Sequence, residues 1–221
     1  MLLSKLFSYK IKCYVMKCII IWYMIKIVIT NEKGGTGKST IACLLTEYLN
    51  YQGQKVQLID TDSIQTSQTW VGNCKVEGRE VSTTPADYQI VDTAGSSGSA
   101  LPWLAQANLI LVPFRPHYAD LQPTVIWFTS LKKDWQEKII FIPNQWQNTK
   151  EQRQGLTELE EVIAEELAHK KRRITSPLTN RPALYGSFLN GSKDNLFARS
   201  DLPEEISDLF TGILKRYEKT N

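Results

Sequence analysis

The chain has 221 residues, of which 42% are hydrophobic and 22% are charged, and its formal net charge is +3. This length and composition suit one well-buried domain, and no repeat or low-complexity tract divides the chain. Four of the 26 basic residues precede Met24 and no acidic residue does, which leaves 22 basic against 23 acidic residues from Met24 onward. The overall charge therefore excludes a globally basic protein, and any contact with DNA would need a local basic patch.

Residues 1–23 form a leader ahead of the first predicted strand. All three methionines, Met1, Met16 and Met24, lie in this leader or directly after it, so we expect a start site placed too early. A targeting or membrane segment is the alternative, because Cys18–Ile25 is an unbroken apolar run. That run has eight residues, whereas roughly 20 are needed to span a bilayer.

The cysteines do not have the spacing of a zinc site or of a disulfide framework. No C-x-x-C pair occurs, and no histidine lies near a cysteine in the sequence. The pattern favours a reducing cytoplasm. The cysteines are Cys13, Cys18, Cys43 and Cys74.

A glycine-rich loop follows the largely apolar run Ile25–Thr30 and reads NEKGGTGKST over residues 31–40. Its glycines allow successive backbone N–H groups to turn toward phosphate oxygens, and the helix that begins near Lys38 adds its positive dipole end. Lys38 supplies an ammonium for the β- and γ-phosphates, and Ser39 supplies a hydroxyl for Mg²⁺. The loop therefore predicts a nucleotide phosphate site. Its residues are Gly34, Gly35, Thr36, Gly37, Lys38, Ser39 and Thr40.

Apolar residues then recur at helical spacing, which predicts a helix to Tyr51 and a strand at Val56–Ile59. Because the later strands are short and mainly apolar, we expect an α/β fold with a mostly parallel central sheet and helices on both faces. Further strands are predicted weakly at Val76–Val81 and clearly at Tyr88–Val91, Leu109–Val112 and Ile139–Ile142. Helices are predicted at Leu121–Lys133, Glu151–His169 and Pro203–Tyr217.

Carboxylates follow two of these strands. Asp60 and Asp62 stand where the second strand ends, and Asp92 ends the strand Tyr88–Val91. Because the carboxyl ends of parallel strands share one edge with the phosphate loop, these groups can hold the waters of Mg²⁺ or a nucleophilic water. The alternative for the first pair is a solvated cap on the next helix. Asp92 matches a Walker B arrangement and is predicted to face the metal.

The loop departs from the usual phosphate-loop pattern, because Glu32 replaces the first glycine and a second lysine, Lys33, follows it. The pattern K-G-G-x-G-K-S resembles the deviant Walker A loop of the ParA/MinD family of P-loop NTPases. The resemblance implies ATP and Mg²⁺ as cofactors, and a homodimer in which Lys33 reaches the partner's nucleotide. ATP would join the subunits, and its slow, partner-stimulated hydrolysis would separate them.

The resemblance also implies roles for residues beyond the loop. Asp62 would position the attacking water, while Asp60 and Asp92 would support the metal shell. Asn144, which follows the strand Ile139–Ile142, would read the adenine edge, although asparagine after a strand is also a common turn former. A guanine-specific site would need an N-K-x-D segment, which the chain lacks after this strand.

The resemblance spans 24–221, which we expect to be a single ATPase domain, and it is greatest to small plasmid-partition ParA proteins. It implies a cytoplasmic protein that binds DNA nonspecifically and associates with the nucleoid. Its protein partner would be a ParB-like or other small adaptor. A basic run at 169–173 could contact phosphate or could simply complement the end of a helix. Further basic residues in this part are Arg181, Lys193, Arg199, Lys215 and Arg216.

Two other functions stay open. The first is a MinD-like or cargo-positioning ATPase that acts on the division site, carboxysomes, chemoreceptors or conjugation machinery. Membrane binding is not expected, because the amphipathic segment Pro203–Tyr217 carries acidic residues on its polar face. The second is a metabolic enzyme on the same scaffold, such as a dethiobiotin synthetase or the iron protein of nitrogenase.

Overall fold

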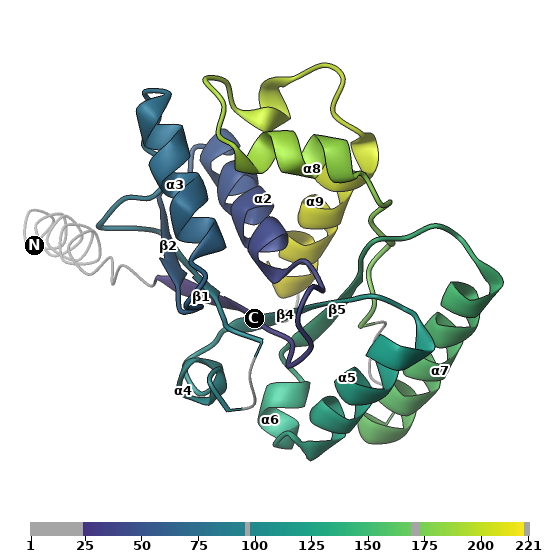
Figure 1. The fold of residues 1–221 in the computed structure, drawn as a ribbon. Helices are drawn as coiled ribbons and strands as arrows, with labels where there is room; N and C mark the ends of the chain where they lie inside the picture. Colours follow the sequence, from purple (N-terminus) through teal and green to yellow (C-terminus); the bar gives the residue numbers. More distant parts are fainter. Residues whose placement is uncertain (1–23, 96–97, 169–172, 219–221) are drawn as a thin grey trace, which may run out of the picture.

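The computed structural model describes residues 24–95, 98–168 and 173–218, and its centre is a five-stranded sheet in the order β2-β3-β1-β4-β5. Every neighbouring pair of strands is parallel (Figure 1). The predicted α/β fold with a parallel sheet is therefore confirmed. The strands are β1 (Ile25–Ile29), β2 (Val56–Asp60), β3 (Tyr88–Asp92), β4 (Leu109–Phe114) and β5 (Ile139–Pro143).

Alternating side chains of the strands build one apolar core on each face of the sheet. Ile27 and Ile29 of β1 belong to one core, whereas Val28 between them belongs to the other. All residues of β4 and β5 are buried, as expected for parallel strands that are covered on both faces. These two cores explain why the strands read as short apolar runs in the sequence.

The first face is covered by α2 (Lys38–Tyr51), α3 (Thr66–Val76), α8 (Pro182–Leu189) and α9 (Glu204–Glu218), with the short helix η1 (Leu196–Ala198) beside them (Figure 1). The second face is covered mainly by α4 (Leu101–Leu104), α5 (Tyr118–Ser130) and α7 (Lys150–Glu166), and α6 (Lys133–Gln136) lies beside α5 (Figure 1). Helices on both faces were predicted, and this arrangement confirms them.

Several predicted boundaries differ from the structure. The weak strand at Val76–Val81 is wrong, because α3 continues through Val76, and Gly78 turns the chain at φ +83°. Val76 is 85% exposed, so the apolar pattern reflected a helix end and not a buried strand. Helix α5 begins and ends three residues earlier than predicted, because His117 and Leu131 are both extended. The predicted helix end at His169 lies outside the described residues.

Candidate functional site

The phosphate loop lies at the carboxyl edge of the sheet. Backbone hydrogen bonds with β4 and with the residue after β3 hold the segment that leads into the loop. Thr30 N donates to Leu111 O on β4 at 3.0 Å, and Thr93 N, from the end of β3, donates to Ile29 O at 3.1 Å. Asn31 is fully buried, and its amide nitrogen donates to Pro113 O at 3.0 Å and to Thr124 Oγ1 of α5 at 3.1 Å. The start of the loop is thereby fixed to the sheet and to α5.

The loop takes the backbone conformation that its glycines permit. Gly35 and Gly37 have φ values of +73° and +92°, which a residue with a side chain rarely adopts. Gly37 is the N-cap of α2, and no side chain caps the first turn of this 14-residue helix. Uncapped amides at a helix N-terminus that follows left-handed glycines form a typical anion-binding concavity.

Lys38 stands at the start of α2 and is only 7% exposed. Its Nζ donates to Lys33 O at 3.1 Å, so the ammonium lies against the loop backbone. Burial lowers the pKa of Lys38, and the charges of Asp92 and Asp62 partly offset this shift. Gly95 also approaches closely, since a Cβ there would lie 3.1 Å from Lys38 Nζ and 3.4 Å from Gly34 Cα. The loop after β3 therefore contacts the phosphate loop directly, and a side chain at position 95 would crowd this contact.

Asp92 is fully buried at the end of β3. Within the described part of the chain, neither carboxylate oxygen accepts a well-formed hydrogen bond, although the hydroxyls of Ser39 and Ser67 lie near enough to lower its pKa. Burial outweighs these hydroxyls and the Lys38 ammonium, and it raises the pKa of Asp92 to about 6. A buried carboxylate without a bonded donor is costly unless a ligand supplies one. The water shell of a Mg²⁺ ion near Ser39 fits this requirement.

Asp60 has a different environment, although it ends the adjacent strand β2. Its Oδ2 accepts hydrogen bonds from Ser67 N at 2.9 Å, Ser67 Oγ at 2.8 Å and Gln68 N at 3.2 Å. Its Oδ1 accepts one from Asp62 N at 2.9 Å. Asp60 therefore caps the first turn of α3, which was the alternative considered for the pair. Its role in the metal shell stays a prediction.

Asp62 lies in the loop between β2 and α3 and is partly exposed. Its Oδ1 accepts from Ile64 N at 3.1 Å and from Ser63 Oγ at 3.4 Å, which forms a local turn. The coulombic effect of Asp62 on Lys38 places the two charges in one electrostatic environment. Its role in orienting water stays a prediction.

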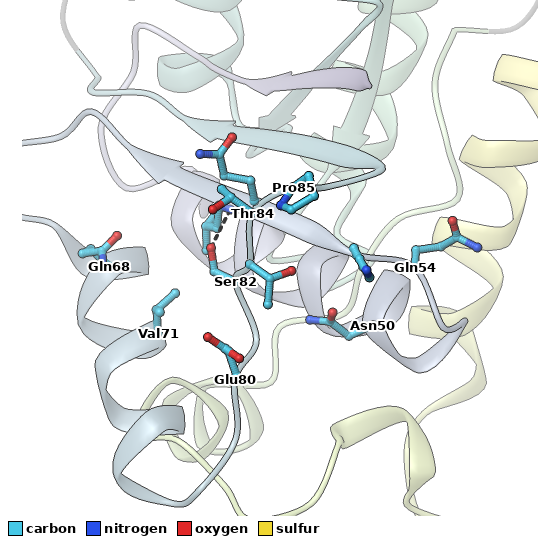
Figure 2. A pocket seen from close by; sticks show the side chains of 12 residues that line it. Asn50, Gln54, Gln68, Val71, Glu80, Ser82, Thr84 and Pro85 are labelled. Carbon is cyan, nitrogen blue, oxygen red and sulfur yellow. Dashed lines mark hydrogen bonds between the residues drawn. The ribbon is translucent and has the colours of Figure 1, made fainter. Parts of the chain in front are cut away.

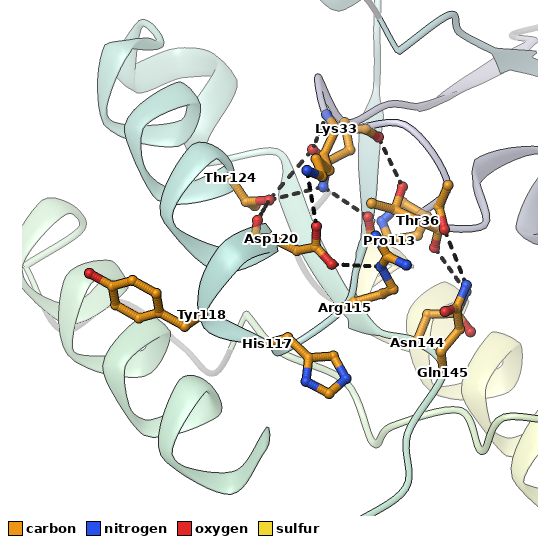
Figure 3. Close-up of polar contacts among 12 residues, drawn as sticks. Lys33, Thr36, Pro113, Arg115, His117, Tyr118, Asp120, Thr124, Asn144 and Gln145 are labelled. Atoms are coloured by element: carbon orange, nitrogen blue, oxygen red, sulfur yellow. Dashed lines mark hydrogen bonds and ion pairs between the residues drawn. The ribbon is translucent and has the colours of Figure 1, made fainter. Parts of the chain in front are cut away.

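Lys33 is held by its own subunit in this structure. Its Nζ lies 3.3 Å from Asp120 Oδ1 on α5, and Arg115 Nε lies 2.6 Å from Asp120 Oδ2 (Figure 3). The Asp120 side chain is 8% exposed and the Lys33 side chain is 38% exposed, so the lysine forms the outer side of this ion-pair cluster. Asp120 and Arg115 were not predicted as site residues. The local signal that could have pointed to Asp120 is that it is an acidic residue in the first turn of α5.

Asn144 lies directly beneath the phosphate loop, from the end of β5. It is 5% exposed, and its Nδ2 donates to Thr36 O at 2.9 Å (Figure 3). The neighbouring residue Gln145, which was not predicted as a site residue, donates from Nε2 to Gly35 O at 3.1 Å. The structure thus brings Asn144 to the site, and the reading of adenine stays a prediction.

A separate open groove of about 750 Å³ lies beside β2 and α3 (Figure 2). No residue of the phosphate loop lines it. Its walls are mainly polar and uncharged, and they include Asn50, Gln54, Gln57, Gln68, Ser82 and Thr84, with Lys55 and Glu80 as charged members. This groove does not belong to the phosphate site.

The predicted basic patch is only partly described. Residues 169–172 lie outside the described residues. Arg181 pairs with Glu205 at 3.1 Å, and Arg199 pairs with Asp201 at 2.7 Å. Lys193 and Lys215 are exposed, whereas Arg216 donates to Ile174 O at 3.4 Å. Two of the predicted cations are therefore already neutralised by neighbouring carboxylates.

Two properties of the described ranges bear on metals and membranes. Among these residues, no group of three or more His, Cys, Asp or Glu side chains could hold a metal ion. In the same part of the chain, no helix is long and apolar enough to cross a membrane.

Comparison with known proteins agrees with this geometry. A family model described as the CobQ/CobB/MinD/ParA nucleotide binding domain matches residues 27–191. A comparison with curated protein sequences found no match.

Several solved structures share the fold. A candidate plasmid partition protein of Borrelia burgdorferi bound to AMPPNP is 17% identical, with a TM-score of 0.64, and the alignment covers 90% of this chain and 100% of that one. The cell division protein MinD of Aquifex aeolicus is 19% identical, with a TM-score of 0.62 and coverage of 86% and 97%. MinD of Pyrococcus horikoshii complexed with Mg-ADP is 14% identical, with a TM-score of 0.61 and coverage of 90% and 97%.

Proposed function

Because the chain belongs to the CobQ/CobB/MinD/ParA nucleotide-binding family, we propose that it is an ATPase that dimerises on ATP binding and drives plasmid or chromosome partition. The family predicted from the phosphate loop is thereby confirmed. Similar folds hold AMPPNP or Mg-ADP, which supports ATP and Mg²⁺ as cofactors of this chain. We also propose that residues 24–221 act as one ATPase domain.

The observation that carries the proposal is the pairing of an anion-binding loop with a buried, unbonded carboxylate. The amides of the loop and Lys38 would hold the triphosphate, and Ser39 and Asp92 would hold Mg²⁺ and its waters. Bound Mg²⁺ would neutralise charge that develops on the phosphates. Asp62 would orient the attacking water, and Asp60 would keep the loop that carries Asp62 in place through its cap on α3.

Lys33 would act in the partner's site. Its ammonium is partly exposed and lies on the outer side of the cluster with Asp120, so it can exchange that carboxylate for a phosphate of a second subunit. The Asp120 carboxylate and the phosphate are both anions, so the charge of Lys33 is compensated before and after the exchange. Dimerisation and hydrolysis would then be coupled, because the charge that completes each site comes from the other subunit.

The substitution Lys33→Ala tests this coupling. We expect loss of ATP-dependent dimerisation, measured by light scattering with a nonhydrolysable ATP analogue and Mg²⁺, while the affinity for ATP changes less than threefold. Lys55→Ala is the matched control, because it removes an exposed lysine from the start of β2, away from the loop. A wild-type protein that stays monomeric with the analogue, or a Lys33→Ala variant that dimerises normally, would refute the role across subunits.

For the cargo, we propose nonspecific DNA, a small ParB-like adaptor and a cytoplasmic, nucleoid-associated location. Binding of random duplex DNA would be compared with ATP and with ADP at two salt concentrations, since contacts to phosphate weaken as salt rises. Indifference to both nucleotide and salt would favour the second candidate, a cargo-positioning ATPase. That candidate is supported by the similarity in fold to MinD proteins.

A further inference from the structure

Two side-chain amides hold the phosphate loop from the side of β5. Asn144 Nδ2 donates to Thr36 O at 2.9 Å, and Gln145 Nε2 donates to Gly35 O at 3.1 Å (Figure 3). The two donors are consecutive residues, and the two acceptors are consecutive carbonyls of the loop. We call this pair of contacts the amide clamp.

The positions of the two acceptors give the clamp its importance. A loop that turns its N–H groups toward phosphate turns carbonyls of the same peptides outward, and buried carbonyls need donors. Thr36 and Asn144 are both buried, so Thr36 O needs such a donor, whereas Gly35 is exposed and its carbonyl gains a second hold on the loop from Gln145. A Cβ at Gly37 would overlap Asn144 Nδ2, so the absence of a side chain at position 37 makes room for the clamp.

The clamp is itself fixed by surrounding structure. Asn144 N donates to Phe114 O of β4 at 2.8 Å. Gln145 has a φ of +55°, which is uncommon for a residue with a side chain, and its carbonyl accepts a hydrogen bond from Gln152 Nε2 at 3.2 Å. Gln152 is fully buried, and its Oε1 accepts from Gln147 N at 2.8 Å. The loop after β5 therefore holds Gln145 in a costly conformation from which its amide reaches the phosphate loop.

We infer that Asn144 and Gln145 are positioning residues that keep the phosphate-loop amides aimed at the triphosphate, and that they thereby set affinity for the phosphates. This inference rests on the proposed nucleotide site. It is distinct from the adenine-reading role predicted for Asn144, because the contact with Thr36 O directs one N–H of the amide to the loop. The two roles give different results with ligands that lack adenine.

The experiment measures the affinity of Asn144→Ala and Gln145→Ala for ATP, GTP and inorganic tripolyphosphate. Positioning predicts that each variant loses affinity for all three ligands by the same factor, roughly tenfold for Asn144→Ala and about threefold for the more exposed Gln145→Ala. Gln147→Ala is the matched control, because Gln147 is an exposed glutamine two residues away whose backbone N–H, and not its side chain, makes the contact with Gln152. Its affinities should equal those of the wild type.

Each contrary result has a distinct meaning. A loss for ATP alone, with GTP and tripolyphosphate unchanged, would show that Asn144 reads the base and would overturn the inference. Unchanged affinity for all ligands in both variants would overturn it as well. If the wild type bound neither ATP nor tripolyphosphate, the proposed function would fail before the clamp was tested.

A second measurement guards against a variant that merely folds poorly. Gly37→Ala is compared in the wild-type and the Asn144→Ala backgrounds, with folding verified by circular dichroism. Because the new Cβ would overlap Asn144 Nδ2, we expect Gly37→Ala to reduce ATP affinity less in the second background, although the φ of +92° penalises alanine in both. Equal losses in the two backgrounds would contradict the clamp.

Discussion

Two buried carboxylates lie beside the phosphate loop, and their surroundings are opposite. Asp120, at the start of α5, is bound by two cations, with Arg115 Nε at 2.6 Å and Lys33 Nζ at 3.3 Å. Asp92, at the end of β3, accepts no well-formed hydrogen bond among the described residues, and burial raises its pKa to about 6. The protein itself satisfies the charge at α5, whereas the charge at β3 fits a cation that comes with the ligand.

The largest expected effect tests the unsatisfied carboxylate. Asp92→Asn keeps the size of the side chain but removes the charge that would hold the waters of Mg²⁺. We expect ATP turnover to fall about 100-fold or more, since electrostatic stabilisation of the developing charge is lost. The measurement is phosphate release at saturating ATP and Mg²⁺. Asp134→Asn is the matched control, because it makes the same change at an exposed residue of α6. Turnover within threefold of wild type in Asp92→Asn would contradict the assignment.

The same two carboxylates should differ in their effect on folding. Asp92→Asn removes an unpaired buried charge, so we expect the free energy of unfolding to rise by roughly 1–2 kcal/mol at pH 7. Asp120→Ala leaves Arg115 and Lys33 without their shared partner, and we expect a decrease of roughly 1–2 kcal/mol after allowance for the partial exposure of both cations. Urea unfolding of the nucleotide-free protein measures both. Changes of the same sign would show that the contrast between the two regions is wrong.

The two regions also differ in how much of each could be predicted from the sequence. Asp92 and the phosphate loop could be predicted, because a strand-end position and the spacing of glycines are local properties of the sequence. The ion pair from Lys33 to Asp120 and the hydrogen bond from Gln145 to Gly35 join segments far apart in the chain, and only the sheet order brings them together. Such contacts leave no periodic pattern in a single sequence.

Some local sequence patterns were also compatible with two different structures. Asp60 after a strand suits either a metal shell or a helix cap, and the direction of its side chain, which depends on where α3 packs, gives it the contacts of a cap in this structure. The mostly parallel sheet with helices on both faces followed from short apolar strands, whereas the segment from Val76 to Val81 gave an apolar pattern without the burial of a strand.

The pKa of Asp92 predicts a dependence of stability on pH. Its folded pKa, about 6, exceeds its ordinary value of 3.8, so between these values the folded state binds more protons than the unfolded state. The free energy of unfolding should therefore fall as pH rises from about 4 to 6, by at most roughly 2 kcal/mol from this group, and should then level off. Lys38 and Asp60 act on the same carboxylate, with opposite signs.

The measurement compares wild-type and Asp92→Asn protein in urea between pH 4 and 7, with a chelator present so that no divalent cation stabilises the carboxylate. Other groups titrate equally in both proteins, so the difference between the two curves isolates Asp92. We expect that difference to grow with pH and to become constant above about pH 6.5. Parallel curves over the whole range would show that Asp92 has an ordinary pKa and that the region at β3 is not strained by an unpaired charge.

The smallest expected effect concerns Arg115, the second cation on Asp120. Its side chain is 32% exposed, so solvent screens the pair, and Arg115→Ala should lower the free energy of unfolding by only about 0.5–1 kcal/mol.

The same substitution should also affect dimerisation. Without Arg115, Lys33 is the cation that remains of the two at Asp120, and Asp120 should bind it more firmly. We therefore expect ATP-dependent dimerisation to need a higher ATP concentration, by about twofold to threefold, in a light-scattering titration. Arg153→Ala is the matched control, since the exposed Arg153 side chain donates hydrogen bonds to Asn148, away from Asp120. An unchanged or lower ATP requirement in Arg115→Ala would mean that Asp120 does not compete with the nucleotide for Lys33, and the satisfied carboxylate would then serve stability alone.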